Sequence, residues 1–135
     1  MDKIKELFLK KPNKEFHVRG IAKLLKISPT SASKYLKKLE NEKLIISEKK
    51  YGHLIFKADT ESINYKVQKR NYNLSSLYNY GIINHLQNEY NHPEAIVLFG
   101  SYSRGEDTEQ SDIDILIISP LKKELKLDQF EKKIE

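Results

Sequence analysis

Two short apolar runs on either side of a glycine-serine turn restrict the folds open to this chain. The first run, residues 94–99 (EAIVLF), is continuous and predicts a buried strand. Gly100 and Ser101 follow it directly. The second run, residues 111–118 (SDIDILII), is rich in β-branched side chains and predicts another strand. The expected order is therefore strand, turn, short helix and strand.

Each part of this arrangement has a chemical use. Gly100 lacks a Cβ, so the backbone can approach an anion closely, and Ser101 would begin a helix whose free N–H groups suit a phosphate. Asp112 and Asp114 are two apart on the predicted strand, so both would point to one face, roughly 7 Å apart. Two carboxylates aimed at one point predict a Mg²⁺ site that still takes phosphate or water ligands. A glycine-serine turn or an Asp-x-Asp alone is common in ordinary surface turns, and only their combination favours nucleotidyl transfer.

The stretch GSYSRGEDTEQSDIDILII resembles the DNA-polymerase-β-like nucleotidyltransferase superfamily, in particular the minimal nucleotidyltransferases of bacteria and archaea. The shared pattern is Gly-Ser, Arg-Gly and then Ser-Asp-x-Asp opening the next strand. The resemblance implies that Gly100 and Ser101 contact a nucleoside triphosphate, with ATP favoured, and that Arg104 lies near its phosphates. It also implies that Asp112 and Asp114 are the catalytic carboxylates and hold Mg²⁺.

One part of the family pattern is missing, namely a third carboxylate on a later strand. The later acidic residues are not in a strand-like context, and Asp128 looks like the N-cap of a helix over residues 129–134. Two explanations stay open: the domain is truncated at its C-terminus, or the enzyme lacks this carboxylate. The motif still favours an NTP-dependent enzyme. The acidic residues after Asp114 are Glu124, Asp128, Glu131 and Glu135.

Charge divides the chain into two unlike parts. Residues 1–58 carry 15 Lys and Arg against 6 Asp and Glu, whereas residues 59–135 carry 9 against 13. A basic part next to an acidic one predicts two domains with different partners, the basic one being the candidate for nucleic acid. The absence of cysteine excludes disulfides, zinc-thiolate sites and thiol chemistry. No apolar run suggests a signal segment or a membrane span, so we expect a cytoplasmic protein with no membrane partner.

Residues 1–58 predict a winged helix-turn-helix domain. Helices are expected over residues 2–10, over 18–25 and from Ser28, the N-cap of a third helix that ends near Asn41. Strands at residues 44–46 and 54–56 would form a hairpin around a turn at residues 48–53. The stretch SPTSASKYLKKLENEKLI resembles the recognition helix and following strand of winged-helix regulators, although Lys43 stands where that family usually has glycine.

A winged helix of this kind would place its third helix in the major groove of double-stranded DNA and its hairpin tip on the backbone. The alternatives are that these lysines form only a solvated face, or that the domain contacts protein. A homodimer on a palindromic site is expected by analogy. The residues expected to face bases are Thr30, Ser31, Ser33 and Lys34, and those expected to face phosphates are Lys37, Lys38, Lys49 and Lys50.

The second half is expected to be a small α/β domain with a mixed sheet, which makes the whole chain α+β. Residues 59–73 predict a linking helix with a break at residues 71–73, and residues 74–135 the nucleotidyltransferase-like domain. From residue 74 to residue 90 apolar side chains recur at helical spacing, which predicts one amphipathic helix packed on the sheet. The stripe consists of Leu74, Leu77, Tyr78, Ile82, Leu86 and Tyr90.

Two functions from different classes remain open at this point. The first is a DNA-binding protein whose second domain transfers a nucleoside monophosphate to a hydroxyl; the resemblance includes antitoxins that nucleotidylate a HEPN-type toxin. The second is a transcriptional regulator whose catalytically incomplete second domain only senses nucleotide. A weaker third possibility makes the winged helix a dimerisation or partner-docking module.

Overall fold

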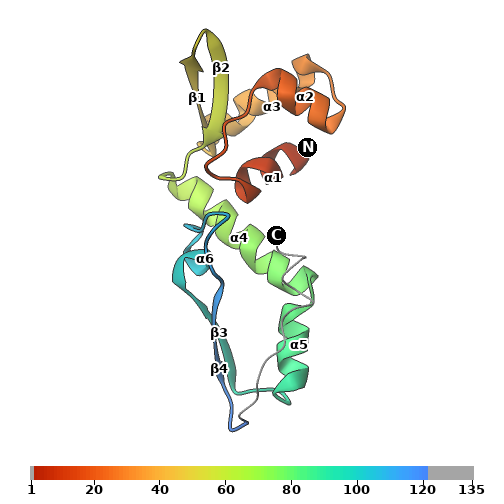
Figure 1. The fold of residues 1–135 in the computed structure, drawn as a ribbon, viewed down its shortest axis with the longest axis vertical. Coiled ribbons are helices and arrows are strands. Elements are labelled where there is room, and N and C mark those ends of the chain that lie inside the picture. Colours follow the sequence, from red (N-terminus) through yellow and green to blue (C-terminus); the bar gives the residue numbers. More distant parts are fainter. Residues whose placement is uncertain (1, 122–135) are drawn as a thin grey trace. The chain divides into compact units, whose positions relative to one another are not determined.

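The computed structural model describes residues 2–121, which fold into six helices and four strands (Figure 1). The chain divides into two compact units, residues 1–68 and residues 69–135. The helix predicted for residues 129–134, its N-cap Asp128, and Glu124, Glu131 and Glu135 lie outside the described residues. Within the described part, no helix has both the length and the apolar character needed to cross a bilayer.

The first unit contains three helices followed by an antiparallel hairpin. Local signals define where two of the helices begin: His17 Nδ1 accepts a hydrogen bond from the Gly20 backbone N–H at 3.0 Å, and Ser28 Oγ accepts one from Ser31 N–H at 3.1 Å. The predicted N-cap at Ser28 is thereby confirmed. The elements are α1 (Asp2–Lys10), α2 (Val18–Leu25), α3 (Pro29–Asn41), β1 (Ile45–Lys50) and β2 (His53–Ala58).

The core of the first unit joins the helices to the hairpin. The buried side of α3 consists of Ala32, Leu36 and Leu39, which recur at helical spacing. The ring of Phe16 packs edge to face on that of Phe8, with centroids 5.0 Å apart. Phe16 also exchanges two backbone hydrogen bonds with Phe56 of β2, at 2.8 and 2.7 Å.

The hairpin differs from the prediction in its turn. β1 continues to Lys50, and the turn is only Tyr51-Gly52, both with positive φ (52° and 76°). A two-residue turn with left-handed residues matches the natural twist of the two strands, so the ladder runs to its end. Lys49 and Lys50 therefore lie on a strand and pair with Leu54 and His53, and are not in the turn as predicted.

The long helix predicted after residue 74 is in fact two helices. α4 (Ile63–Asn79) runs without interruption through residues 71–73, where we predicted a break, and α5 (Ile82–Glu89) follows it. The break lies at Gly81, whose φ of 83° is readily adopted only by a residue without a Cβ. Asn73 does not form a turn, because its side chain is buried in the domain.

The second unit packs α5 and the end of α4 on one face of a two-stranded sheet, β3 (Ala95–Phe99) and β4 (Asp114–Ile118). Within the described residues this sheet is antiparallel and not mixed as predicted. Two members of the predicted stripe, Leu74 and Tyr78, face the sheet across a cavity but remain 49% and 58% exposed. The core consists of Leu77, Ile82, Leu86, Tyr90 and Tyr102, against which Ile96, Leu98, Ile113, Ile115 and Ile117 pack.

The other face of this sheet carries a row of exposed apolar side chains. The strand predicted to be buried has an inward row and an outward row, and the outward row pairs across the strands. The exposed apolar side chains on it are Val97, Phe99, Leu116 and Ile118, each between 40% and 52% exposed.

Candidate functional site

The glycine turn and the second carboxylate lie side by side. β3 ends at Phe99, and α6 (Gly100–Arg104) begins at the next residue. Phe99 pairs with Asp114 in the β3–β4 ladder, so the last residue of β3 lies opposite the first residue of β4. Gly100 has a φ of 78°, and a Cβ added to it would collide with the Asp114 carboxylate, whose Cγ would be 3.2 Å away. The fold thus joins two predicted site residues that are 14 positions apart.

Asp112 is supported differently from Asp114. We predicted both on one strand, but β4 begins at Asp114, so Asp112 lies in the connection before it. Asp114 is half-buried and Asp112 is exposed. A tight turn precedes Asp112, in which Ser111 Oγ accepts from Thr108 N–H at 2.9 Å and Ser111 N–H donates to Thr108 O at 3.1 Å.

The remaining predicted residues of this site lie on α6. This helix has only five residues, so it has little macrodipole, and any anion would be bound mainly by local N–H groups. Ser101 is half-buried, and the neighbouring Ser103 Oγ donates to Gly100 O at 2.7 Å, which braces the turn. Arg104 is exposed, and its Nε lies 3.2 Å from Glu106 Oε2.

A buried polar network beside this turn was not anticipated from the sequence. Lys69 Nζ lies 3.2 Å from Asp107 Oδ2, with the two side chains only 5% and 6% exposed. Asn73 Nδ2 donates to Asp107 Oδ1 at 2.7 Å and to Tyr102 O at 2.9 Å, and the Tyr102 hydroxyl donates to Asn73 O at 3.1 Å. We call these four residues the Lys69–Asp107 network.

Burial perturbs two groups in the network. Burial lowers the pKa of Lys69 from its ordinary value, an effect that the neighbouring Asp107 carboxylate opposes. Burial raises the pKa of the Tyr102 hydroxyl, and the charge on Asp107 adds to that rise. The only sequence signal for this network was the spacing of four between Lys69 and Asn73, which places them on one helix face.

The carboxylates near the turn have the chemistry of a hard-cation site. Carboxylate oxygens are the ligands that Mg²⁺ prefers, and Mg²⁺ commonly uses only one or two carboxylates with phosphate and water. Asp114 at the glycine turn and Asp112 two residues before it fit that requirement. Among residues 2–121, no cluster of three or more His, Asp or Glu side chains suited to a metal is found.

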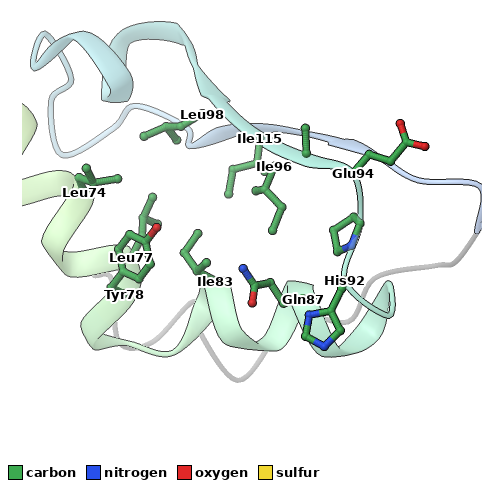
Figure 2. A pocket seen from close by; sticks show the side chains of 12 residues that line it. Leu74, Leu77, Tyr78, Ile83, Gln87, His92, Glu94, Ile96, Leu98 and Ile115 are labelled. Atoms are coloured by element: carbon green, nitrogen blue, oxygen red, sulfur yellow. The ribbon is translucent and has the colours of Figure 1, made fainter.

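The second unit also contains a cavity of about 300 Å³ between its helices and the inner face of the sheet. Figure 2 shows side chains of α4 and α5 facing Ile96, Leu98 and Ile115 across it, with Gln87, His92 and Glu94 nearer one end. None of the predicted nucleotide-site residues is among the described residues that line it. Apolar side chains line the part of the cavity where the helices pack on the sheet, and the end near Gln87, His92 and Glu94 is polar.

In the first unit the predicted DNA-facing residues gather on α3. Thr30, Ser31, Lys34, Lys37 and Lys38 are exposed, whereas Ser33 is half-buried. The Lys38 ammonium lies 5.5 Å from the centre of the Tyr35 ring. Lys49 and Lys50 are exposed on β1, and Lys50 Nζ lies 2.9 Å from Glu15 Oε1. A shallow groove of about 760 Å³ follows α3, lined by Ser31, Lys34, Tyr35, Lys37, Lys38, Asn41 and Glu42.

Comparison with known proteins bears on the second unit. Residues 80–135 match the nucleotidyltransferase domain family. The matched segment includes the glycine turn, α6 and both carboxylates. A Methanocaldococcus jannaschii protein named "Putative protein adenylyltransferase MJ0604" is 74% identical over 23 residues, 17% of this chain. Those residues are 23% of that relative, so the chain covers only about a quarter of its length. No solved structure matches the chain.

Proposed function

We propose that the second unit transfers a nucleoside monophosphate from ATP to a hydroxyl group. In that reaction the acceptor hydroxyl releases its proton to solvent and its oxygen forms a bond to the α-phosphorus. The bond from this phosphorus to the bridging oxygen breaks, and pyrophosphate leaves. The observation that carries the proposal is the contact between Gly100 and Asp114, because it places a carboxylate at the turn where α6 begins. The match of residues 80–135 to the nucleotidyltransferase domain family supports the same reaction.

The residues of the chain divide this work between binding and orientation. Gly100 leaves room for the Asp114 carboxylate beside the turn, and the backbone N–H groups after it would hold the phosphates. Arg104, at the surface end of α6, would pair with an outer phosphate in exchange for Glu106. Asp112 and Asp114 would hold Mg²⁺, which when bound neutralises charge on the phosphates.

We propose a protein as the hydroxyl acceptor. The name of the M. jannaschii relative describes a protein adenylyltransferase, which supports both a protein acceptor and ATP as donor. A HEPN-type toxin is the partner that the family resemblance suggests. The test is incubation with labelled ATP and the partner, with label expected on a partner hydroxyl and lost in Asp114→Asn.

The nucleotide site itself is tested first, by thermal unfolding with and without MgATP or MgGTP. Ligand that binds only the folded state adds about 2.7 kcal/mol at a hundredfold excess over its dissociation constant. We expect a metal-dependent rise in Tm that Asp112→Asn/Asp114→Asn loses. Glu109→Gln is the matched control, since it removes an exposed carboxylate from the same connection and should keep the shift. No shift with any triphosphate would refute the proposal.

A second function is favoured by the first unit, where lysines line the exposed side of α3. Three helices followed by a hairpin, with basic side chains on the third helix, support a winged helix that binds double-stranded DNA. By analogy with other winged helices, it would bind as a homodimer. The protein would then be a regulator whose second unit senses nucleotide. MgATP should in that case change the dissociation constant for DNA, and DNA that for MgATP, by the same factor.

Salt dependence separates DNA binding from protein docking. Each neutralised phosphate contributes about −0.9 to the slope of log K against log salt, so Lys37→Gln/Lys38→Gln, which removes two of the cations expected to face phosphates, should make the slope shallower by about 1.8. Lys3→Gln/Lys23→Gln removes the same charge from exposed positions on α1 and α2 and should leave the slope nearly unchanged. A flat wild-type slope would instead make the first unit a docking module.

A further inference from the structure

The Lys69–Asp107 network fixes the part of the second unit that the sheet does not hold. The connection at residues 105–113 joins α6 to β4 and contributes no rung to the β3–β4 ladder, which ends at Asp114. Asp107 anchors this connection to α4 through both carboxylate oxygens, one bound by Lys69 and the other by Asn73. Asn73 of α4 also exchanges hydrogen bonds with Tyr102 of α6, so a single helix holds both α6 and the connection that follows it.

The anchor leads directly to Asp112. Asp107 is followed by the turn of residues 108–111, in which Thr108 and Ser111 bond to each other through backbone and side chain. Asp112 is the next residue, and it is exposed and lies outside the ladder. Asp112 is therefore held between the turn, which follows Asp107, and Ile113, whose side chain packs on the core. Asp107 fixes the side of this arrangement that the core does not.

We propose that Asp107, held by Lys69 and Asn73, is a positioning residue that places Asp112 beside Asp114 for a divalent cation. This inference rests on the nucleotidyl-transfer site proposed above, and it assigns to that site a support on α4. The cation and the nucleotide would contact Asp112 and Asp114, whereas Asp107 would act only through the turn.

The energetics of buried ion pairs agree with a role in placement. Taking two charges out of water costs much of what their attraction returns, so a buried pair is weak evidence for stability. Burial already works against the charge of Lys69. The contacts instead fix the orientation of the Asp107 carboxylate, because its two oxygens are bound by Lys69 and Asn73 from successive turns of α4.

The test compares the metal requirement of variants that are all folded. The wild type, Asp107→Asn and Leu86→Ala would be titrated with Mn²⁺ and with Mg²⁺ at a fixed concentration of fluorescent ATP. Binding is followed by anisotropy, at a temperature where circular dichroism shows each variant folded. Leu86 lies in the core of the same unit and outside the network, so Leu86→Ala controls for lost stability alone.

We expect Asp107→Asn to raise the metal midpoint about tenfold, since partners that orient metal-binding side chains typically account for that much affinity. Binding at saturating metal should be restored, because the glycine turn is untouched. Leu86→Ala should keep the wild-type midpoint. If Asp107→Asn does not fold, Lys69→Met/Asp107→Asn carries the same expectation, since it leaves no unpaired buried charge.

An unchanged midpoint in Asp107→Asn, or equal shifts in Asp107→Asn and Leu86→Ala, would overturn the positioning role while leaving the nucleotide site intact. A wild type that binds no fluorescent ATP with either metal would overturn the proposed function, and the positioning role with it.

Discussion

The Asp114 carboxylate fills the space in which a side chain at Gly100 would begin, and an added Cβ would lie 3.2 Å from its Cγ. This contact requires both the absence of a side chain at residue 100 and the pairing of Phe99 with Asp114. The glycine therefore serves two purposes, because it supplies a left-handed backbone conformation and leaves room for the acid.

Gly100→Ala should abolish the metal-dependent rise in Tm with MgATP. The new methyl group would displace the Asp114 carboxylate, and the left-handed backbone would add strain of about 1–3 kcal/mol. Thermal and urea unfolding with and without MgATP would measure both effects.

Gly52→Ala is the matched control for this substitution. Gly52 has nearly the same φ, 76°, but an added Cβ would meet nothing within 4 Å. We expect a loss of about 1–2 kcal/mol from the left-handed backbone alone, with the MgATP shift retained. Equal MgATP shifts in the two alanine variants would refute the steric argument.

Lys43→Gly should stabilise the first unit. Lys43 follows α3 with a φ of 61°, a conformation that disfavours any residue with a Cβ. The relief of strain should exceed the entropy that glycine loses on folding and leave a net gain of about 1 kcal/mol. Urea unfolding would measure the gain, and Lys43→Ala, which keeps a Cβ, should not reproduce it.

Stability at alkaline pH should depend on Tyr102. Burial raises the pKa of this hydroxyl above the value of about 10 in an unfolded chain. The folded state therefore retains a proton that the unfolded state loses, so this contribution is complete below about pH 10 and declines above it. Tyr102→Phe loses a hydrogen bond worth about 1 kcal/mol at neutral pH, but its stability should fall less between pH 9 and pH 11.

Lys69 makes stability depend on pH in the opposite direction. Comparing the wild type with Tyr102→Phe cancels this contribution. Its lowered pKa means that stability rises with pH between that value and about 10.4, where an unfolded lysine titrates. Both variants contain Lys69, so the difference between their pH profiles reports Tyr102. Parallel profiles would contradict the assigned direction.

Glu15→Gln should strengthen DNA binding without changing Tm measurably. The Lys50–Glu15 pair is exposed, and such pairs contribute little to stability. Releasing Lys50 would free one cation for a phosphate, making the salt slope steeper by about 0.9. Electrophoretic mobility shifts at several salt concentrations would measure it, and an unchanged slope would exclude Lys50 from the interface.

Much of the local structure followed from the sequence. The third helix of the first unit was predictable because Ser28 and Pro29 mark a helix start and Ala32, Leu36 and Leu39 repeat at helical spacing. The strand, turn and helix around Gly100 were also predictable, because glycine readily adopts the backbone conformation that a tight turn between a strand and a helix requires.

The missed features depend on tertiary contacts. Asn73 has the side chain of a turn residue, yet α4 continues through it because Tyr102 and Asp107 satisfy its amide. Gly81 was overlooked as the helix break because the apolar spacing continues past it. Nothing in the neighbours of Asp107 along the chain indicates that it pairs with a lysine 38 positions earlier.

The different supports of Asp112 and Asp114 have a consequence for how the protein would lose activity on heating. Asp114 belongs to a strand rung, whereas Asp112 is held through a connection anchored by side chains. Segments of this kind open locally at free energies well below that of global unfolding. Inactivation should therefore begin below the melting transition, and cooling should reverse it as long as the sheet has stayed paired.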